Sequence, residues 1–411
     1  MRAPSLDHIN VRILRALAWC AFGVSLVAAA ARCAPPVIVT SEPAPARPRP
    51  DSTRVATTPP TPPPTTPPVA PPATPPRTAP LPRPIAVWPV RVHEHVDLWL
   101  HGFAMLQEDS TLVPYFQPHY RRQLLEMRSP LRLTTQLDLN TDRLRTRLVA
   151  NPGVIAAQFV PLYFASWEEL RQAADLFLRL DGDPRGARDR RSGQLVATFG
   201  AYFPAAADRE WLRLFLSSLD DERVRFYDQY WRETQRARGA VFDAVDRLWR
   251  QTVAARFERF LNNSQQRDGE ILLSLPLAGE GRTLTPPTHL ITVAVGFPDD
   301  TAKAAEMVYA FAHEIVGSMA NAVVTDNTSP AERRSGAADR YSSLAAVRGG
   351  AMLLARVAPD LAPGYMAYYL SLARRPASGG DVERSFAATF ALPDGLRDAL
   401  RRQIYIILGG I

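Results

Sequence analysis

The chain has 411 residues and a formal net charge of +7, a length that suits one large domain or two modest ones. Residues 1–92 contain ten arginines and three acidic residues, so they carry the whole excess of positive charge, and the remainder contains 38 basic and 38 acidic residues. A neutral remainder gives no support for a nucleic-acid-binding surface. The two cysteines, Cys20 and Cys33, precede the folded region predicted below, which excludes a disulfide or a catalytic thiol within it.

The first 33 residues have the pattern of an export signal. A basic start with Arg2, Arg12 and Arg15 is followed by an apolar run over 16–31, whose last alanines offer A-x-A cleavage sites. This run is shorter than the roughly 20 apolar residues of a membrane span. We therefore predict a cleaved signal peptide or an uncleaved N-terminal anchor over 1–33, and a periplasmic, cell-envelope or extracellular location. Lipidation at Cys33 is a further alternative, which the preceding arginine disfavours.

Residues 34–91 form a segment rich in proline and threonine. Of the 38 prolines in the chain, 21 lie between residues 35 and 89. Such a sequence has too few apolar side chains to form a core and too few backbone donors to fold. We predict a disordered, extended linker, which at about 3.1 Å per residue could hold a domain on the order of 100 Å from an anchor. A ligand for proline-binding domains is the alternative.

From residue 92 onward, apolar residues recur at helical spacing. The stretch HEHVDLWLHGFAMLQ predicts a first helix, and Ser166-Trp167-Glu168-Glu169 has the pattern of a capping box that starts another. Residues 134–139 alternate weakly between polar and apolar side chains, a helix start follows at 140–142, and 182–193 is a charged loop. Residues 220–262 predict long amphipathic helices with a break near Gly239.

Two later segments have the composition of β-strands. The first covers 270–277, where Pro276 favours an edge position, and the second covers 289–297, after a turn at 279–281. A long apolar helix follows, with His313 and Glu314 in its middle, and then helices near 331–357, 362–374 and 394–408. The predicted fold class is mainly α with a small β-sheet (α+β). Its domain covers 92–411 and combines long helices with a short antiparallel or mixed sheet.

The order of strand, acidic turn and apolar helix with an internal His-Glu pair resembles the active-site helix of zincin-type zinc metallopeptidases. In the H-E-x-x-H signature of these enzymes, two histidines one turn apart bind zinc and the glutamate is the general base. By position, His313 matches the first zinc ligand and Glu314 the general base, while Gly317 replaces the second histidine. The resemblance covers about 232–375. It implies a degenerate zincin-like core of the Glu type, with the pair in the wall of a cleft beneath a sheet edge.

The signature is incomplete in a second respect as well. The candidates for the downstream acidic ligand, Asp326, Glu332 and Asp339, lack the E-x-x-x-[DE] context of that family. A catalytic zinc normally has three protein ligands, and His313 is the only one that the sequence pattern identifies. Three interpretations therefore stay open: a buried His-Glu pair that holds helices together, a degenerate metal site, and a working peptidase.

A second group of histidines lies in the first predicted helix. His93, Asp97 and His101 recur every fourth residue on one helical face. The outer two would lie roughly 12 Å apart, too far for one ion bound at about 2 Å to join all three. Two of them could share an ion with help from His95 or His119. We favour the alternative of a polar helix face with a partly buried histidine.

These observations predict an exported, envelope-tethered protein with a metallopeptidase-like domain. If it is an enzyme, zinc is its cofactor and a peptide or protein its substrate, whereas membrane contact is expected only through the N-terminal segment. The alternative is a non-catalytic binding or scaffolding protein built on the same helical domain. A third alternative is a helical adaptor unrelated to peptidases, which would be favoured if the two β-segments did not pair beside the helix of His313.

Overall fold

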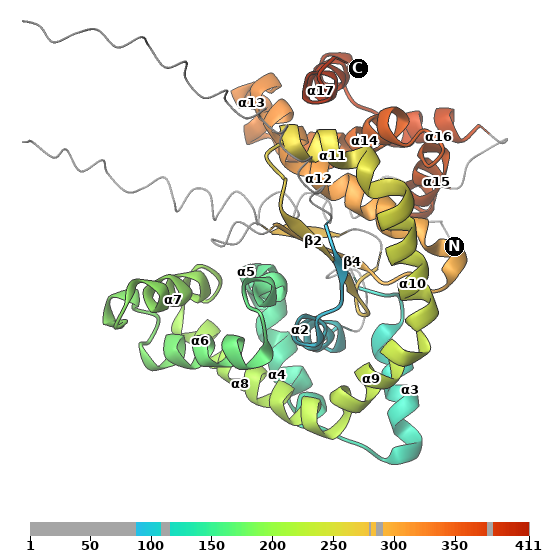
Figure 1. The fold of residues 1–411 in the computed structure, drawn as a ribbon. Helices are drawn as coiled ribbons and strands as arrows, with labels where there is room; N and C mark the ends of the chain where they lie inside the picture. Colours follow the sequence, from blue (N-terminus) through green and yellow to red (C-terminus); the bar gives the residue numbers. More distant parts are fainter. Residues whose placement is uncertain (1–87, 108–115, 279–280, 285–290, 376–380, 411) are drawn as a thin grey trace, which may run out of the picture. The chain divides into compact units, whose positions relative to one another are not determined.

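The computed structural model describes residues 88–107, 116–278, 281–284, 291–375 and 381–410. The predicted signal or anchor and the linker up to residue 87 lie outside these residues. The described part is mostly helical, with a small mixed sheet between its groups of helices (Figure 1). This arrangement confirms the predicted fold class, mainly α with a small β-sheet.

The sheet has four described strands: β1 (Val90–Arg91), β2 (Gly269–Ser274), β3 (Arg282–Leu284) and β4 (Ile291–Gly296). Their order is β1-β2-β4-β3, with the first three parallel and β3 antiparallel to β4. The two β-segments predicted from sequence, β2 and β4, are therefore neighbours. The edge position predicted for 270–277 is wrong, because β2 ends at Ser274, before Pro276, and lies between β1 and β4.

The sheet separates two hydrophobic cores. Ile271 and Leu273 of β2 pack into one core, whereas Leu272, between them, packs into the other. This follows from the alternation of side chains between the two faces of a strand. Because both faces are covered by helices, the strands need apolar residues at nearly every position. Runs such as Glu270-Ile-Leu-Leu-Ser274 and Ile291-Thr-Val-Ala-Val-Gly296 meet that need.

The helices that precede residue 223 build the first core. Their bounds are α2 (Glu94–Met105), α3 (Tyr120–Arg128), η1 (Ser129–Leu131), α4 (Gln136–Ala150), α5 (Pro152–Ile155), η2 (Ala156–Tyr163), α6 (Trp167–Arg179), η3 (Pro184–Gly186), α7 (Arg190–Tyr202) and α8 (Ala206–Glu222). The helix α2 is buried on all sides, since every residue from His95 to Met105 is buried. It therefore forms the centre of this core.

A nearly continuous helical run connects the first core to β2. After α8 it continues as the π-helical turn η4 (Arg223–Tyr227), α9 (Asp228–Ala237), α10 (Gly239–Leu248), the π-helical turn η5 (Trp249–Val253) and α11 (Ala254–Asn263). The break predicted near Gly239 is confirmed, because α9 ends at Ala237 and α10 begins at Gly239.

The helices that follow the sheet build the second core, together with α10 and α11. Their bounds are η6 (Thr301–Lys303), α12 (Ala305–Asn327), α13 (Pro330–Arg334), α14 (Ala337–Val357), α15 (Ala362–Leu372), α16 (Val382–Thr389) and α17 (Asp394–Ile407). Among the described helices, only the segment Thr301–Asn327 is long and apolar enough to cross a membrane, and 61% of its most apolar window is buried inside the domain.

The structure corrects three local predictions. Trp88 to Arg91, assigned to the linker, belong to the domain, because Trp88 is only 1% exposed and its carbonyl accepts a hydrogen bond of 2.6 Å from Trp249 Nε1. The helix start predicted at 140–142 is placed too late, because α4 begins at Gln136, within the weakly alternating segment, where the Thr135 N–H donates to Asp138 (2.9 Å). The charged loop at 182–193 is interrupted by η3 and ends where α7 begins at Arg190.

The close approach of α2 and α8 gives a first prediction. A Cβ at Gly102 would lie 2.7 Å from Leu219 Cδ2 and from the Phe215 ring, and both side chains are fully buried. Because these side chains have no space to move into, we expect Gly102→Ala to lower the free energy of unfolding by about 1–3 kcal/mol. Urea unfolding followed by circular dichroism would measure the change.

The matched control is Gly239→Ala at the start of α10, where an added Cβ meets nothing within 4 Å. This variant should be neutral or more stable by up to about 1 kcal/mol, because alanine favours the helix. Equal effects of the two substitutions would contradict the packing account.

Candidate functional site

The His313–Glu314 pair lies in the middle of α12 and is nearly closed off from solvent. The two side chains expose 9% and 10% of their surface. The Nδ1 atom of His313 donates to Glu314 Oε1 over 3.0 Å, since a carboxylate can only accept. Thr283 Oγ1, on the edge strand β3, donates to Glu314 Oε2 over 2.9 Å. The ring of Tyr369 from α15 stacks on the imidazole with centroids 5.4 Å apart.

These contacts set the charge of Glu314. Burial alone raises the pKa of this carboxyl, but the hydrogen bonds and charges of His313, Arg282 and Thr283 outweigh burial and bring the pKa below its ordinary value. Both carboxylate oxygens already accept a hydrogen bond. Glu314 is therefore an ionised acceptor that joins α12 to β3.

The residues around the pair do not fit a catalytic zinc, which normally takes three protein ligands. Gly317, one turn further along α12, has no side chain. In the described ranges, no group of three His, Cys, Asp or Glu side chains is close enough to hold a metal ion. Asp326 lies exposed near the end of α12, Glu332 caps α13 through Ser329, and Asp339 is in the first turn of α14. We therefore derive no step through a metal.

The face of α2 that carries His93, Asp97 and His101 directs each of them to a different partner. His93 Nε2 lies 3.4 Å from Glu270 Oε2 of β2. Asp97 Oδ2 accepts from Trp231 Nε1 over 2.9 Å, and burial raises the pKa of this carboxyl to about 6. His101 lies deeper, at the Glu222 network described next. The exposed His119 precedes α3 in the left-handed conformation and is not part of this face.

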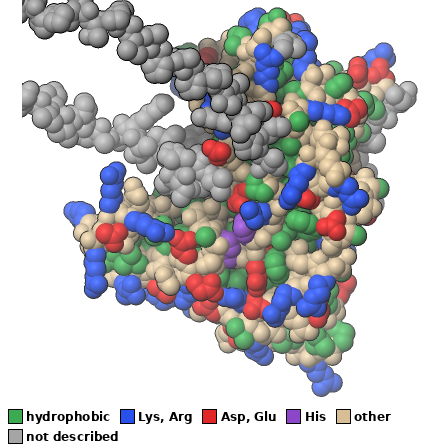
Figure 2. Space-filling view, in the orientation of Figure 1, with side chains coloured by type: hydrophobic (Ala, Val, Ile, Leu, Met, Phe, Trp, Pro, Cys, Tyr) green, Lys and Arg blue, Asp and Glu red, His purple; other side chains and the backbone are tan. Residues whose placement is uncertain are grey.

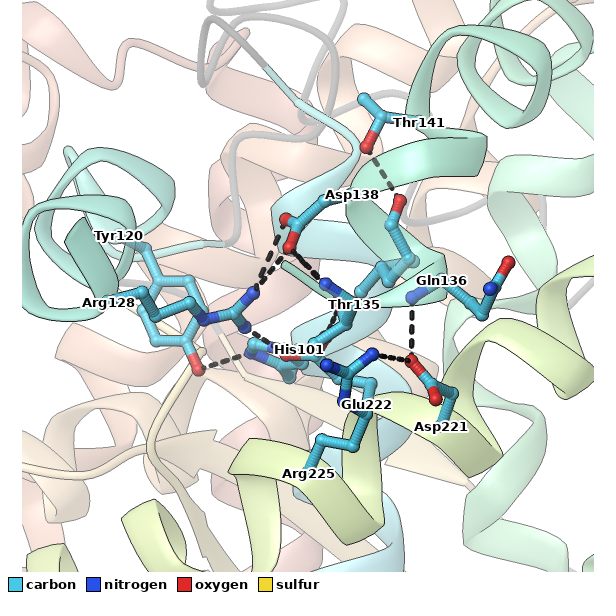
Figure 3. A network of polar contacts seen from close by, with 11 residues as sticks. His101, Tyr120, Arg128, Thr135, Gln136, Asp138, Thr141, Asp221, Glu222 and Arg225 are labelled. Atoms are coloured by element: carbon cyan, nitrogen blue, oxygen red, sulfur yellow. Dashed lines mark hydrogen bonds and ion pairs between the residues drawn. The ribbon is translucent and has the colours of Figure 1, made fainter. Parts of the chain in front are cut away.

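A buried polar network that the sequence did not predict is centred on Glu222 at the end of α8 (Figure 3). Glu222 is fully buried and accepts hydrogen bonds from His101 Nε2 (2.9 Å), the Arg128 guanidinium and the Thr135 hydroxyl. Arg128, only 2% exposed at its side chain, also donates to Asp138 (3.2 Å). Tyr120 lies 3.1 Å from the other nitrogen of His101.

The protonation states in this network follow from burial and from its partners. Burial lowers the pKa of His101, so the ring is neutral near pH 7, and we infer that its Nε2–H donates to Glu222 while its Nδ1 accepts from Tyr120. Burial raises the pKa of Glu222, but the hydrogen bonds and charges of His101, Arg128 and Thr135 lower it by more, so the pKa lies below its ordinary value. The network is thus one buried carboxylate neutralised by one buried guanidinium.

The three members of this network that bond to Glu222 could not be paired from sequence. His101, Arg128 and Thr135 precede Glu222 by 121, 94 and 87 positions. The one local signal was Thr135 with Asp138, which has the spacing of a capping box. No protein-family model matches the chain, and neither a curated protein nor a solved structure matches it. The geometry of the described residues is therefore the basis for proposing a function.

The buried Glu222 network gives a second prediction. Glu222→Gln would leave the Arg128 guanidinium in the core with one carboxylate fewer, and breaking a buried pair in this way costs about 3–5 kcal/mol. We expect the free energy of unfolding to fall by that amount in chemical denaturation at pH 7.

The neighbouring substitution Asp221→Asn is the control. Asp221 is 26% exposed at its side chain, accepts from the Gln136 N–H (2.7 Å) and lies 3.8 Å from Arg225. Its loss should cost no more than about 1 kcal/mol. A Glu222→Gln variant as stable as this control would show that the network contributes little.

Proposed function

We propose that the protein is exported, is tethered to the cell envelope by its N-terminal segment and proline-rich linker, and acts there as a non-catalytic binding or scaffolding protein. The observation that carries this proposal is the closed contact of His313 and Glu314 with Thr283 and Tyr369. A pair engaged in this way serves packing between α12, β3 and α15. It supports the interpretation of a buried His-Glu pair over that of a working peptidase.

A second proposal concerns ancestry, and a specific observation favours it. The two β-segments pair beside the helix of His313, and the antiparallel edge strand β3 contacts Glu314. This is the relation between pair and sheet edge that the zincin resemblance implies, and it speaks against a helical adaptor unrelated to that fold. We therefore propose that a zincin-like core was kept while its metal site was lost at position 317.

Metal content tests the non-catalytic proposal directly. After dialysis, the purified full chain should hold far less than one zinc ion per molecule by mass spectrometry of the metal, and His313→Ala should leave that content unchanged. Near-stoichiometric zinc that disappears in His313→Ala would overturn the proposal in favour of a metallopeptidase.

Gly317→His is the informative comparison for this measurement. It places two imidazoles one helical turn apart, about 6 Å between their Cβ atoms, and an added Cβ at Gly317 meets nothing within 4 Å. We expect this variant to retain more zinc than the wild type. That result would also support the proposal that the metal site was lost through this position.

The export proposal has its own test. Expressed with its natural N-terminus in a bacterial host, the chain should fractionate with the periplasm or envelope. The mass of the recovered chain should place its first residue within 29–33 if the signal is cleaved, or near residue 1 if the signal is kept as an anchor. A variant lacking 1–33 should stay in the cytoplasm. Cytoplasmic recovery of the full chain would contradict the proposal.

A further inference from the structure

The helix α17 presents large apolar side chains to solvent in its last turn. Tyr405 is 49% exposed and Ile406 is 64% exposed. Figure 2 shows hydrophobic side chains beside Lys or Arg side chains at the end of the molecule where α17 lies. The opposite face of the helix is buried in the second core through Leu396, Leu400, Ile404 and Leu408. The helix is therefore held by one face and leaves the other without a partner among the described residues.

Two arginines flank these apolar side chains. Arg402 lies one turn before Ile406 on α17. Arg259 of α11 lies against the end of α17, because a Cβ added at Gly409 would meet its Nη2 at 2.6 Å. Both arginines are exposed, and within the described ranges neither has a carboxylate at ion-pair distance. We call Arg259, Arg402, Tyr405 and Ile406 the α17 face.

The end of α17 has a defined geometry. Gly409 adopts a φ of +72°, in the left-handed region, and its N–H donates to the Ile406 carbonyl over 2.9 Å. The Gly410 N–H donates to the Tyr405 carbonyl over 2.9 Å. These two bonds form a Schellman motif, which satisfies carbonyls that the helix end would otherwise leave free. The exposed side chains of the last turn therefore project from a capped helix.

Acidic residues do not cancel the charge of the α17 face. Asp394 and Asp398 lie nearer the start of α17, where they pair with Arg397 (2.9 Å) and Arg401 (3.1 Å). The one acid of α11, Glu258, is partly buried and lies about 100° around that helix from the arginine that follows it. The α17 face is therefore both apolar and positively charged.

This face lies near the point where the linker enters the domain. Trp88, the first described residue, donates from its indole Nε1 to the Gln266 carbonyl over 3.2 Å. Asn263, at the end of α11, donates to the Ile407 carbonyl of α17 over 2.6 Å. Three positions of the chain thus separate the contact with Trp88 from the contact with α17. A tether to the membrane, as proposed above, therefore joins the domain at the end that carries the α17 face.

An anionic lipid surface fits this combination of side chains. Its negative potential attracts basic residues, and tyrosine is suited to the headgroup level because its ring is apolar and its hydroxyl is polar. An exposed isoleucine gains free energy when it enters the boundary with the acyl chains. A polyanion without an apolar phase would bind the arginines and leave Ile406 in water. The exposed apolar residues are what favour a bilayer.

We propose that the α17 face docks the domain on an anionic lipid bilayer. Tyr405 and Ile406 enter the boundary between headgroups and acyl chains, while Arg259 and Arg402 lie at the level of the lipid phosphates. The contact is small, and the tether compensates for this because it raises the local concentration of the domain at the membrane. This inference deepens the proposed envelope tethering, on which it rests, by assigning the side of the domain that faces the bilayer.

Fluorescence from a label on the α17 face tests the inference in the full chain. Ile406→Cys, with both native cysteines replaced by alanine, is labelled with nitrobenzoxadiazole, whose emission shifts to the blue in an apolar environment. Vesicles of phosphatidylglycerol and phosphatidylcholine in about equal amounts should produce this shift, and high salt should reverse it. Because the label reports only its own surroundings, insertion of the N-terminal segment does not by itself shift the emission.

Two controls belong to this measurement. Vesicles of phosphatidylcholine alone should leave the emission at position 406 unchanged. A label at Leu131→Cys, an apolar residue of the first core that is 69% exposed, should not respond to either kind of vesicle. The proposal is overturned by an unshifted label at 406 with anionic vesicles, by an equal shift with phosphatidylcholine alone, or by an equal shift at position 131.

Three variants locate the contact. Arg259→Gln and Arg402→Gln should each raise the lipid concentration of the half-maximal shift about fivefold, and Tyr405→Ser should raise it about tenfold. Arg190→Gln is the matched control, because this arginine of α7 is also exposed and without an ion-pair partner among the described residues. All four side chains are exposed, so the variants should fold. Unchanged lipid affinity in the first three would overturn the site.

A titration with heparin distinguishes a lipid surface from a polyanion. Heparin should leave the emission at position 406 unshifted, whereas a blue shift with heparin equal to that with anionic vesicles would overturn the proposal. The vesicle measurement uses purified protein and does not depend on export. An unshifted label therefore fails this inference and leaves the proposed function standing, whereas cytoplasmic recovery of the full chain fails the proposed function itself.

Discussion

Burial of α2 with its ionisable side chains is the constraint on which the rest of the domain depends. Polar groups taken out of water cost several kcal/mol each unless they find hydrogen-bond partners. His95, Asp97 and His101 are at most 6% exposed, and each forms a hydrogen bond with a different part of the chain. His95 reaches the Phe164 carbonyl, Asp97 reaches Trp231 of α9, and His101 reaches Glu222 at the end of α8. The partners of one helix thus fix the positions of the elements around it.

The π-helical turn η4 directly follows Glu222 and packs against His101 of α2. Glu222 just before it points into the buried network with Arg128, whereas Arg223, the first residue of the turn, donates to Asp228 and Glu168 nearer the surface. Phe226 and Tyr227, within the same turn, place their rings against Arg128 and His101. A wider turn inserts a residue into the helical repeat, and such insertions occur frequently at functional sites.

Much of the fold could be predicted from sequence where the signal is local. The period of α12, the apolar runs of β2 and β4, and the break at Gly239 all depend on residues close together in the chain. The edge position predicted from Pro276 was wrong because the sequence does not show that β2 stops pairing at Ser274, before this proline.

The candidate site was less predictable, since its chemistry depends on long-range contacts. The adjacency of His313 and Glu314 is visible in the sequence. Glu314 also accepts a hydrogen bond from Thr283, which lies on β3 and is 31 positions away in the sequence. The sequence does not show that β3 contacts α12 and so leaves both oxygens of Glu314 with a hydrogen-bond partner. Glu222 and Arg128, 94 positions apart, gave no signal at all.

The opposed pKa shifts of two buried groups on α2 make the stability of the domain depend on pH in opposite directions. Burial lowers the pKa of His95 to about 4, so its contribution to stability is complete above 6.5 and is lost as the pH falls towards 4. Burial raises the pKa of Asp97 to about 6, so its contribution is complete below 3.8 and is lost as the pH rises towards 6. Each contribution to the free energy of unfolding amounts to about 3 kcal/mol. Between pH 4 and 6 the contribution of His95 increases with pH while that of Asp97 decreases.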